Sequence, residues 1–256
     1  MTWMDTGLFD REILIYHELL KKKHCSKIFW FTYGVNDEKL SDLLKDRNDL
    51  NKNIIVIGMP KIFNSRIGKI IYSLLLPFLQ KKHINKVRII ISNQMKGSIS
   101  GVLAKWVFNK KLIVRCGYER FRFYLHENSN TQYKKPILYC NSKLSYHSSD
   151  AIIQTSKSAV DFVSREFKVH RGKIFSHSNY IDTNLFRRSK NFNNSKRIVF
   201  VGRLSEQKNI MVLLDSINLT NIGLDIIGDG EYKDTILKYA ANHSIDVQLL
   251  GRVKNK

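Results

Sequence analysis

The 256-residue sequence is poor in cysteine: it has three, and they lie far apart. Cys25, Cys116 and Cys140 show none of the paired spacings that bind zinc, and the eight histidines add no cluster with metal-binding spacing. An odd, sparse set of cysteines is typical of a reducing compartment. These absences exclude a disulfide scaffold and a zinc module.

Long apolar runs are missing as well. The best candidate for a membrane span, residues 70–79, has ten residues and contains Pro77, whereas a membrane-spanning helix needs about 20 apolar residues. The first residues, MTWMDTGLFDRE, carry acidic side chains and lack the apolar centre of a signal peptide. With 43% apolar residues the chain can still bury a core. We therefore expect a folded, cytoplasmic protein.

Acidic residues are absent between Asp49 and Glu119, a stretch that holds thirteen lysines and arginines. The net charge of +21 is concentrated in residues 1–190, where 34 basic and 15 acidic residues give +19, while residues 191–256 have 9 against 7 and give +2. A general bias toward lysine and asparagine is one explanation. A basic face for anionic lipid or for an anionic acceptor is the other, and both stay open.

Three binding signatures are also missing. The sequence has no G-x-x-x-x-G-K-[ST] loop, and the glycine pair at residues 228–230 lacks the third glycine of a dinucleotide fingerprint. Charge alone would allow a nucleic-acid binder, but the aromatic and basic interleaving of RNA-binding folds and a helix-turn-helix signature are absent. A dehydrogenase and a nucleic-acid binder are therefore poor alternatives.

Short apolar segments alternate with helical ones along the whole chain. We expect strands at residues 27–33, 53–58, 87–92, 111–115, 150–155, 173–177, 197–202, 223–228 and 246–250. Buried β-branched strands that alternate with helices predict an α/β fold with parallel sheets covered on both faces. The polar stretch 187–196 predicts a linker between two Rossmann-like domains, residues 1–186 and 197–256.

The clearest candidate site is the turn in the segment RIVFVGRLSEQKN, residues 197–209. Gly202 ends a strand and would let a phosphate approach the backbone. Arg203 offers a planar fork to phosphate oxygens, and Lys208 offers a point charge. The alternative is an ordinary strand–helix turn with solvated cations. We expect a phosphate site at the carboxyl end of this strand.

The segments VGRLSEQKN and LDIIGDGEYKDTILKYAANHSIDVQLLGRV resemble the retaining GT-B glycosyltransferases of family 4, the glycosyl transferases group 1. The resemblance implies that Arg203 and Lys208 hold the diphosphate of a nucleotide-sugar. It implies donor-nucleotide contacts at Gly202, Gly228, Asp229, Gly230, Gly251, Arg252 and Val253. The segments NYIDTNLF and TGLFDREILIYHELL extend the resemblance over nearly the whole chain, with Tyr180 where glycine is usual.

The resemblance also implies what lies outside this sequence. The family's E-x7-E segment, which binds the donor's ribose and sugar, would follow Lys256. The first strand of the amino-terminal domain would precede the first helix, and the glycine loop after that strand corresponds to Gly7. We therefore expect a GT-B fold truncated at both ends, with an incomplete second domain.

On the first domain, Arg115, Tyr118 and Ser156 fall at strand ends, where an acceptor would bind. The alternatives are helix capping for Ser156 and plain surface exposure for Arg115 and Tyr118. Many members of the family carry a histidine near this position. Because this sequence has Arg115 there instead, no catalytic histidine is assigned.

Residues 63–82 predict a long helix that Pro77 bends. One broad face carries Ile67, Ile70, Ile71, Leu74, Leu75 and Phe78, and Arg66, Lys69, Lys81 and Lys82 lie around it. We expect this face to pack on the core, as most such faces do. The alternative is a helix that lies on an anionic membrane surface.

Together these features predict a retaining glycosyltransferase that moves a sugar from a nucleoside-diphosphate donor to a glycan or lipid-linked acceptor in cell-surface polysaccharide or glycolipid assembly. No metal is expected, because in GT-B enzymes protein cations neutralise the diphosphate. Peripheral contact with an anionic membrane, at the inner face of the plasma membrane, is a further expectation. The alternative is an inactive fragment or a non-catalytic binding subunit of such an enzyme.

Overall fold

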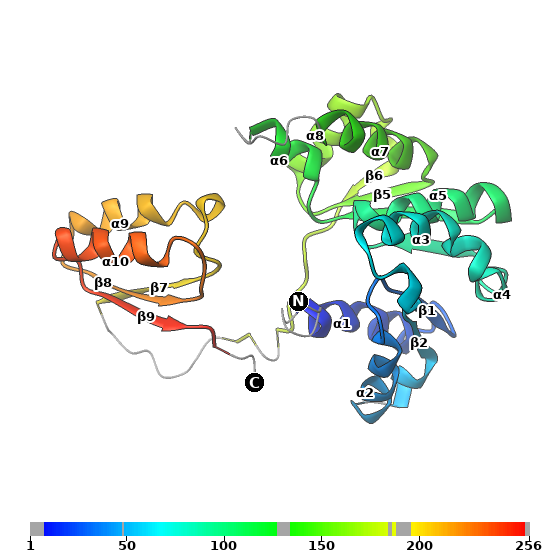
Figure 1. The fold of residues 1–256 in the computed structure, drawn as a ribbon, viewed down its shortest axis with the longest axis horizontal. Helices are drawn as coiled ribbons and strands as arrows, with labels where there is room; N and C mark the ends of the chain where they lie inside the picture. The colour runs from blue at the N-terminus through cyan, green and yellow to red at the C-terminus, as the bar shows by residue number, and fades with distance from the viewer. Residues whose placement is uncertain (1–7, 48, 127–133, 184–185, 188–195, 254–256) are drawn as a thin grey trace. The chain divides into compact units, whose positions relative to one another are not determined.

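The computed structural model describes residues 8–47, 49–126, 134–183, 186–187 and 196–253 (Figure 1). The chain divides into two compact units, residues 1–183 and 184–256. The expected linker lies a few residues later, at 187–196, and residues 188–195 are outside the described part. In both units every strand pair is parallel and helices alternate with strands, so the predicted α/β class is confirmed.

The first unit follows the predicted order of elements. Its helices are α1 (Leu8–Lys21), α2 (Leu40–Arg47), α3 (Arg66–Leu79), α4 (Lys81–Ile84), α5 (Met95–Phe108), α6 (Arg120–His126), α7 (Lys135–Ser148) and α8 (Lys157–Phe167). Its strands are β1 (Ile28–Phe31), β2 (Ile54–Ile57), β3 (Ile89–Ser92), β4 (Lys111–Cys116), β5 (Ala151–Gln154) and β6 (Ile174–Ser176).

These strands form two parallel sheets, β1–β2 and β3–β4–β5–β6. Among the described residues, no backbone ladder joins the two sheets. Polar side chains join them instead, since Asn93 after β3 donates to the hydroxyl of Tyr16 on α1, and the guanidinium of Arg115 on β4 pairs with Glu12 on α1. Helices α3 and α5 also pack against each other (Figure 1). Helix α1 thus ties the two sheets together at the carboxyl ends of β3 and β4.

The core of the larger sheet is built from alternate residues of its inner strands. Leu112, Val114 and Cys116 on β4 are fully buried. Helices α7 and α8 cover them with Tyr146 and Phe167, which are also fully buried. Period-two burial on a strand between helices is the pattern that the sequence predicts.

The second unit is a three-stranded parallel sheet in the order β7–β8–β9. Its elements are β7 (Arg197–Val201), α9 (Ile210–Asn218), β8 (Gly223–Ile227), α10 (Lys233–Asn242) and β9 (Val247–Gly251). Both helices lie on the same side of the sheet (Figure 1), where Leu224 and Ile226 are fully buried. On the opposite side, Val199 and Val201 are 57% and 71% exposed. The expectation that both faces are covered is therefore wrong for the described part of this unit, because it has only two helices.

The segment expected to form one helix over residues 63–82 is divided. Helix α3 begins after Ser65, whose Oγ accepts a hydrogen bond from Gly68 N at 2.8 Å, and it ends two residues beyond Pro77. The six apolar side chains that were expected to face the core are instead exposed, from 41% for Leu75 to 71% for Ile67. The prediction of a core-facing apolar side is therefore wrong, because α3 packs through the opposite side.

Candidate functional site

The turn after β7 extends the pairing of β7 with β8 beyond the carboxyl ends of both strands. Gly202 N donates to Ile227 O at 3.0 Å, and Leu204 N donates to Asp229 O at 3.1 Å. The Leu204 side chain is fully buried in the core beneath α9 and α10. This buried leucine fixes the backbone of the turn, so the residues on either side of it are held in place.

Glycines allow the backbone segments of this turn to approach each other. A Cβ added to Gly228 would lie 1.8 Å from Gly202 O, and one added to Gly230 would lie 2.2 Å from Leu204 O. Gly228 N donates to Gly251 O at 2.8 Å. The structure therefore brings three predicted segments, which begin at Gly202, Gly228 and Gly251, together at one end of the sheet.

The two cations of the turn are free to meet an anion. Arg203 and Lys208 are both exposed, and neither forms an ion pair with any residue that the structure describes. Lys208 ends a 3-10 turn, residues 206–208, and Asn209 follows with φ of +47° before α9 begins. The nearby Asp229 carboxylate accepts a hydrogen bond from Gly230 N at 2.9 Å. Two accessible cations beside a close-packed glycine backbone can bind phosphate oxygens.

The remaining predicted residues of this site lie at its edge. Arg252 and Val253 are exposed beyond the end of β9, and Val253 is 62% exposed. Their position next to Gly251 is compatible with a ligand that extends past the strand ends.

The predicted acceptor-side residues of the first unit have different partners. Arg115 pairs with Glu12, and their side chains are 15% and 7% exposed, so the alternative of plain surface exposure does not hold for Arg115. Tyr118 is 40% exposed and its ring stacks on Phe123 with centroids 3.9 Å apart. Ser156 Oγ accepts from Ala159 N at 3.2 Å, which confirms the predicted helix cap. Gly7 lies outside the described residues.

A buried carboxylate in the loop after β4 is a feature that the sequence analysis missed. Glu119 is 5% exposed and accepts hydrogen bonds from Phe121 N at 3.2 Å, from Ser142 Oγ at 3.0 Å and from the hydroxyl of Tyr146. Burial raises the pKa of Glu119, although the three hydrogen bonds act in the opposite direction. The carboxylate anchors this loop to α7. Its only sequence signal is that it ends the acid-free stretch.

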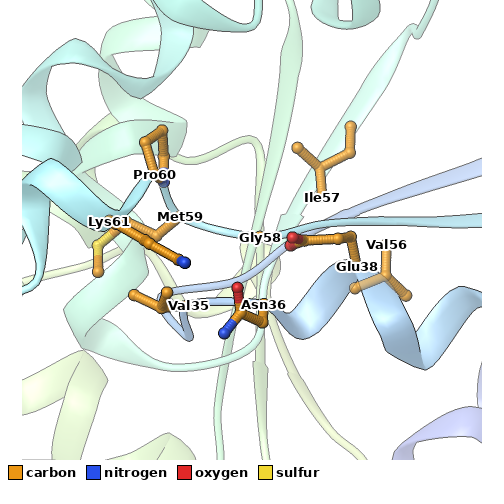
Figure 2. Close-up of a pocket in the computed structure, with 9 residues that line it drawn as sticks. All are labelled: Val35, Asn36, Glu38, Val56, Ile57, Gly58, Met59, Pro60 and Lys61. Carbon is orange, nitrogen blue, oxygen red and sulfur yellow. The ribbon is translucent and has the colours of Figure 1, made fainter.

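A cavity of about 340 Å³ lies at the carboxyl ends of β1 and β2 (Figure 2). Its lining residues are Val35, Asn36, Glu38, Val56, Ile57, Gly58, Met59, Pro60 and Lys61. The Glu38 carboxylate lies against Gly58, where an added Cβ would come within 2.4 Å of its Oε2. A carboxylate, an amide and an ammonium group around an apolar floor can hydrogen-bond a polyhydroxylated ligand. None of these residues was expected as a site from the sequence.

Two features are absent from the described residues. No three His, Cys, Asp or Glu side chains there lie close enough to hold a metal ion. No helix there has the length and apolar character needed to cross a bilayer. The expectation that donor binding needs no metal stays a prediction.

Comparison with known proteins gives a family match over the second unit and a shared fold over most of the chain. Residues 182–256 match the family model described as Glycosyl transferases group 1. A sequence search among curated proteins finds no match. Solved structures of similar fold include Alr3699/HepE of Anabaena, determined with UDP and glucose, at 16% identity and a TM-score of 0.58, with 89% of this chain and 70% of that chain covered.

Two more solved structures agree with this fold. The lipopolysaccharide outer core galactosyltransferase WaaB has 16% identity and a TM-score of 0.57 over 89% of this chain and 68% of that one. A glycosyltransferase from Rickettsia africae has 15% identity and a TM-score of 0.63 over 97% of this chain and 65% of that one. Residues 182–256 therefore match the group 1 glycosyltransferase family, and the chain as a whole shares the GT-B fold of these solved structures.

Proposed function

We propose that the protein is a retaining glycosyltransferase that transfers a sugar from a nucleoside-diphosphate sugar to an acceptor of cell-surface polysaccharide or glycolipid. The turn after β7 carries this proposal, because Arg203 and Lys208 are exposed and have no ion-pair partner among the described residues. An anion that bears two phosphates would meet both cations beside the glycine backbone at residues 202 and 228–230.

In the proposed reaction the bond between the sugar's anomeric carbon and the β-phosphate oxygen breaks, and its electron pair stays on the diphosphate. An acceptor hydroxyl oxygen forms the new bond to the same face of that carbon, and the departing diphosphate takes up the hydroxyl proton. Arg203 and Lys208 stabilise the negative charge that develops on the leaving group, which is often a large contribution to catalysis. Because the protein supplies these charges, we propose that the reaction needs no metal ion.

Similar structures support a nucleotide-sugar as the proposed donor and a glycolipid as the proposed acceptor. The Anabaena protein has been solved with UDP and with UDP-glucose, which makes a uridine nucleotide-sugar the first donor to test. WaaB is described as a lipopolysaccharide galactosyltransferase, which supports a glycolipid acceptor. We place the reaction in the cytoplasm, at the inner face of the plasma membrane. We further propose that the cavity of Figure 2, with Glu38 and Lys61, contacts acceptor hydroxyl groups.

A donor screen on the full 256-residue chain tests the proposal. Purified protein is incubated with UDP-, GDP- and ADP-sugars, and released nucleoside diphosphate is measured with and without EDTA. We expect release from one class of donor, undiminished by EDTA and reduced at least about tenfold by Arg203→Ala or Lys208→Ala. Arg165→Ala and Lys238→Ala, which remove exposed charges on α8 and α10, serve as matched controls.

Three results would count against the proposal. An equal loss of nucleotide release in the Arg165→Ala and Lys238→Ala controls would show that turnover depends on the overall positive charge and not on the turn. Loss of release in EDTA would contradict metal independence. Nucleotide binding without release from any donor would favour a non-catalytic binding subunit.

A further inference from the structure

Helix α3 presents an apolar face to solvent. Its packed side consists of the buried residues Gly68, Tyr72, Ser73, Leu76 and Pro77. Seven large apolar side chains lie on the rest of the helix and are 41–71% exposed: Ile67, Ile70, Ile71, Leu74, Leu75, Phe78 and Leu79. At about 100° per residue they span roughly half of the helix circumference. An exposed apolar surface of this extent marks an interaction site.

The apolar face continues at both ends of the helix. Ile62, in the 3-10 turn before α3, is 85% exposed. At the other end, the ring of Phe78 lies 6.1 Å from that of Phe108 at the end of α5. The neighbouring Trp106 and Val107 are 57% and 50% exposed. The exposed apolar surface therefore extends from α3 to Ile62 on one side and to the end of α5 on the other.

Exposed basic residues lie near both ends of this helix. Lys61, Arg66 and Lys69 lie at its start, and Lys81, Lys82 and Lys86 follow its end. No acidic residue occurs between positions 49 and 119, so no carboxylate from this stretch offsets these charges. The partner of the face must therefore offer both an apolar layer and a high density of negative charge.

A second copy of this chain fits that requirement poorly, because each copy has a net charge of +21 and would bring the same basic flanks together. An anionic bilayer satisfies both conditions. Its acyl boundary accepts the apolar side chains, and its phosphate headgroups attract the lysines.

We propose that α3, with the basic residues at both of its ends, is a docking surface for an anionic membrane. The helix lies in the plane of the headgroups, with Ile67, Ile70 and Leu74 inserted and the lysines of residues 81–86 over lipid phosphates. This docking does not require sugar transfer by the second unit, so its test stands apart from the donor screen.

Vesicle flotation of the full chain tests the proposal. Vesicles of phosphatidylcholine alone are compared with vesicles that contain phosphatidylglycerol, at low and at high salt. We expect binding to the anionic vesicles, no detectable binding to the neutral ones, and weaker binding at high salt because screening reduces the lysine contribution. The triple change Lys81→Gln, Lys82→Gln, Lys86→Gln should lower binding by about 100-fold, since each lysine contributes roughly fivefold.

The apolar part is tested with Ile67→Ser, Ile70→Ser, Leu74→Ser, which alters side chains that are 71%, 61% and 45% exposed. We expect at least about tenfold weaker binding, because insertion of the apolar side chains is lost. The matched control is Ile137→Ser, Val212→Ser, Leu237→Ser, at 69%, 54% and 43% exposure. A matched charge control is Lys157→Gln, Lys233→Gln, Lys238→Gln, all exposed.

Binding that is retained in both controls and lost in both α3-region variants supports the docking surface. Wild-type binding by the serine variant would overturn it, as would equal binding to neutral vesicles. Analytical ultracentrifugation tests the alternative that a second copy of the chain binds this face. A wild-type dimer that the serine variant converts to a monomer, with no vesicle binding by either, would assign the face to a second copy of the chain.

Discussion

Replacement of Gly228 by alanine tests whether the close approach of the β7 and β8 ends builds the candidate site. The added Cβ would lie 1.8 Å from Gly202 O, and Gly228 has φ of +153°, a conformation that favours glycine. A backbone conformation of this kind costs about 1–3 kcal/mol for other residues. Overpacking adds about 1–3 kcal/mol. We therefore expect Gly228→Ala to reduce the free energy of unfolding of the second unit by about 2–6 kcal/mol.

Two other glycines of the same site serve as graded controls. A Cβ on Gly202 would lie 3.3 Å from the ring of Phe200, which can shift, so Gly202→Ala should cost less than about 1 kcal/mol. A Cβ on Gly251 meets nothing within 4 Å, but φ there is +68°. Gly251→Ala should therefore cost about 1 kcal/mol from the left-handed backbone alone.

Differential scanning calorimetry of the full chain measures this series. For a unit of 60–100 residues, 1 kcal/mol corresponds to about 4–8 °C in Tm. Gly228→Ala should lower the Tm of the second unit by more than about 8 °C, against a few degrees for the two controls. A Tm for Gly228→Ala equal to that of Gly202→Ala would refute the described packing of the turn.

Two further predictions concern the first unit. Arg115→Met should lower the stability of this unit by about 3 kcal/mol, because the buried Glu12 loses its guanidinium partner. The double variant Glu12→Met, Arg115→Met should recover part of that loss in chemical denaturation. An Arg115→Met variant as stable as the wild type would contradict the buried ion pair. Burial raises the pKa of Glu119 in the folded state, so as pH rises this carboxyl ionises first in the unfolded state. The free energy of unfolding therefore falls as pH rises from the ordinary pKa of a glutamate to the raised pKa of the folded state. Glu119→Gln lacks this loss, and its Tm relative to wild type should increase between pH 4.5 and pH 8; a constant difference would argue against the raised pKa.

The sequence contains enough information to predict the elements and the turn, because both depend on local patterns. The second unit illustrates this, since apolar β-branched segments and a glycine at the strand end specify β7 and β8 within a residue or two. The meeting of Gly228 with Gly251 also follows from parallel order, because carboxyl ends of parallel strands share one edge.

Features that depend on distant partners could not be predicted. Arg115 and Glu12 are 103 positions apart, and nothing in either local sequence indicates the other. Helix α3 is apolar on nearly every side, so periodicity cannot tell which side packs; only the fold shows that Tyr72 and Leu76 are buried while Ile67 is exposed. The position of Glu119 beneath α7 likewise arises from packing between separate helices and strands.

The central claim is that the turn after β7 binds the diphosphate of a nucleotide-sugar, and isothermal titration calorimetry with UDP, GDP and ADP tests it most directly. We predict that the full chain binds one of these nucleotides. Arg203→Ala should weaken that binding by at least about tenfold, because hydrogen bonds to charged groups contribute about 1.5–3 kcal/mol, while Arg165→Ala leaves it unchanged. Equal affinity of Arg203→Ala and wild type for the bound nucleotide would contradict the claim.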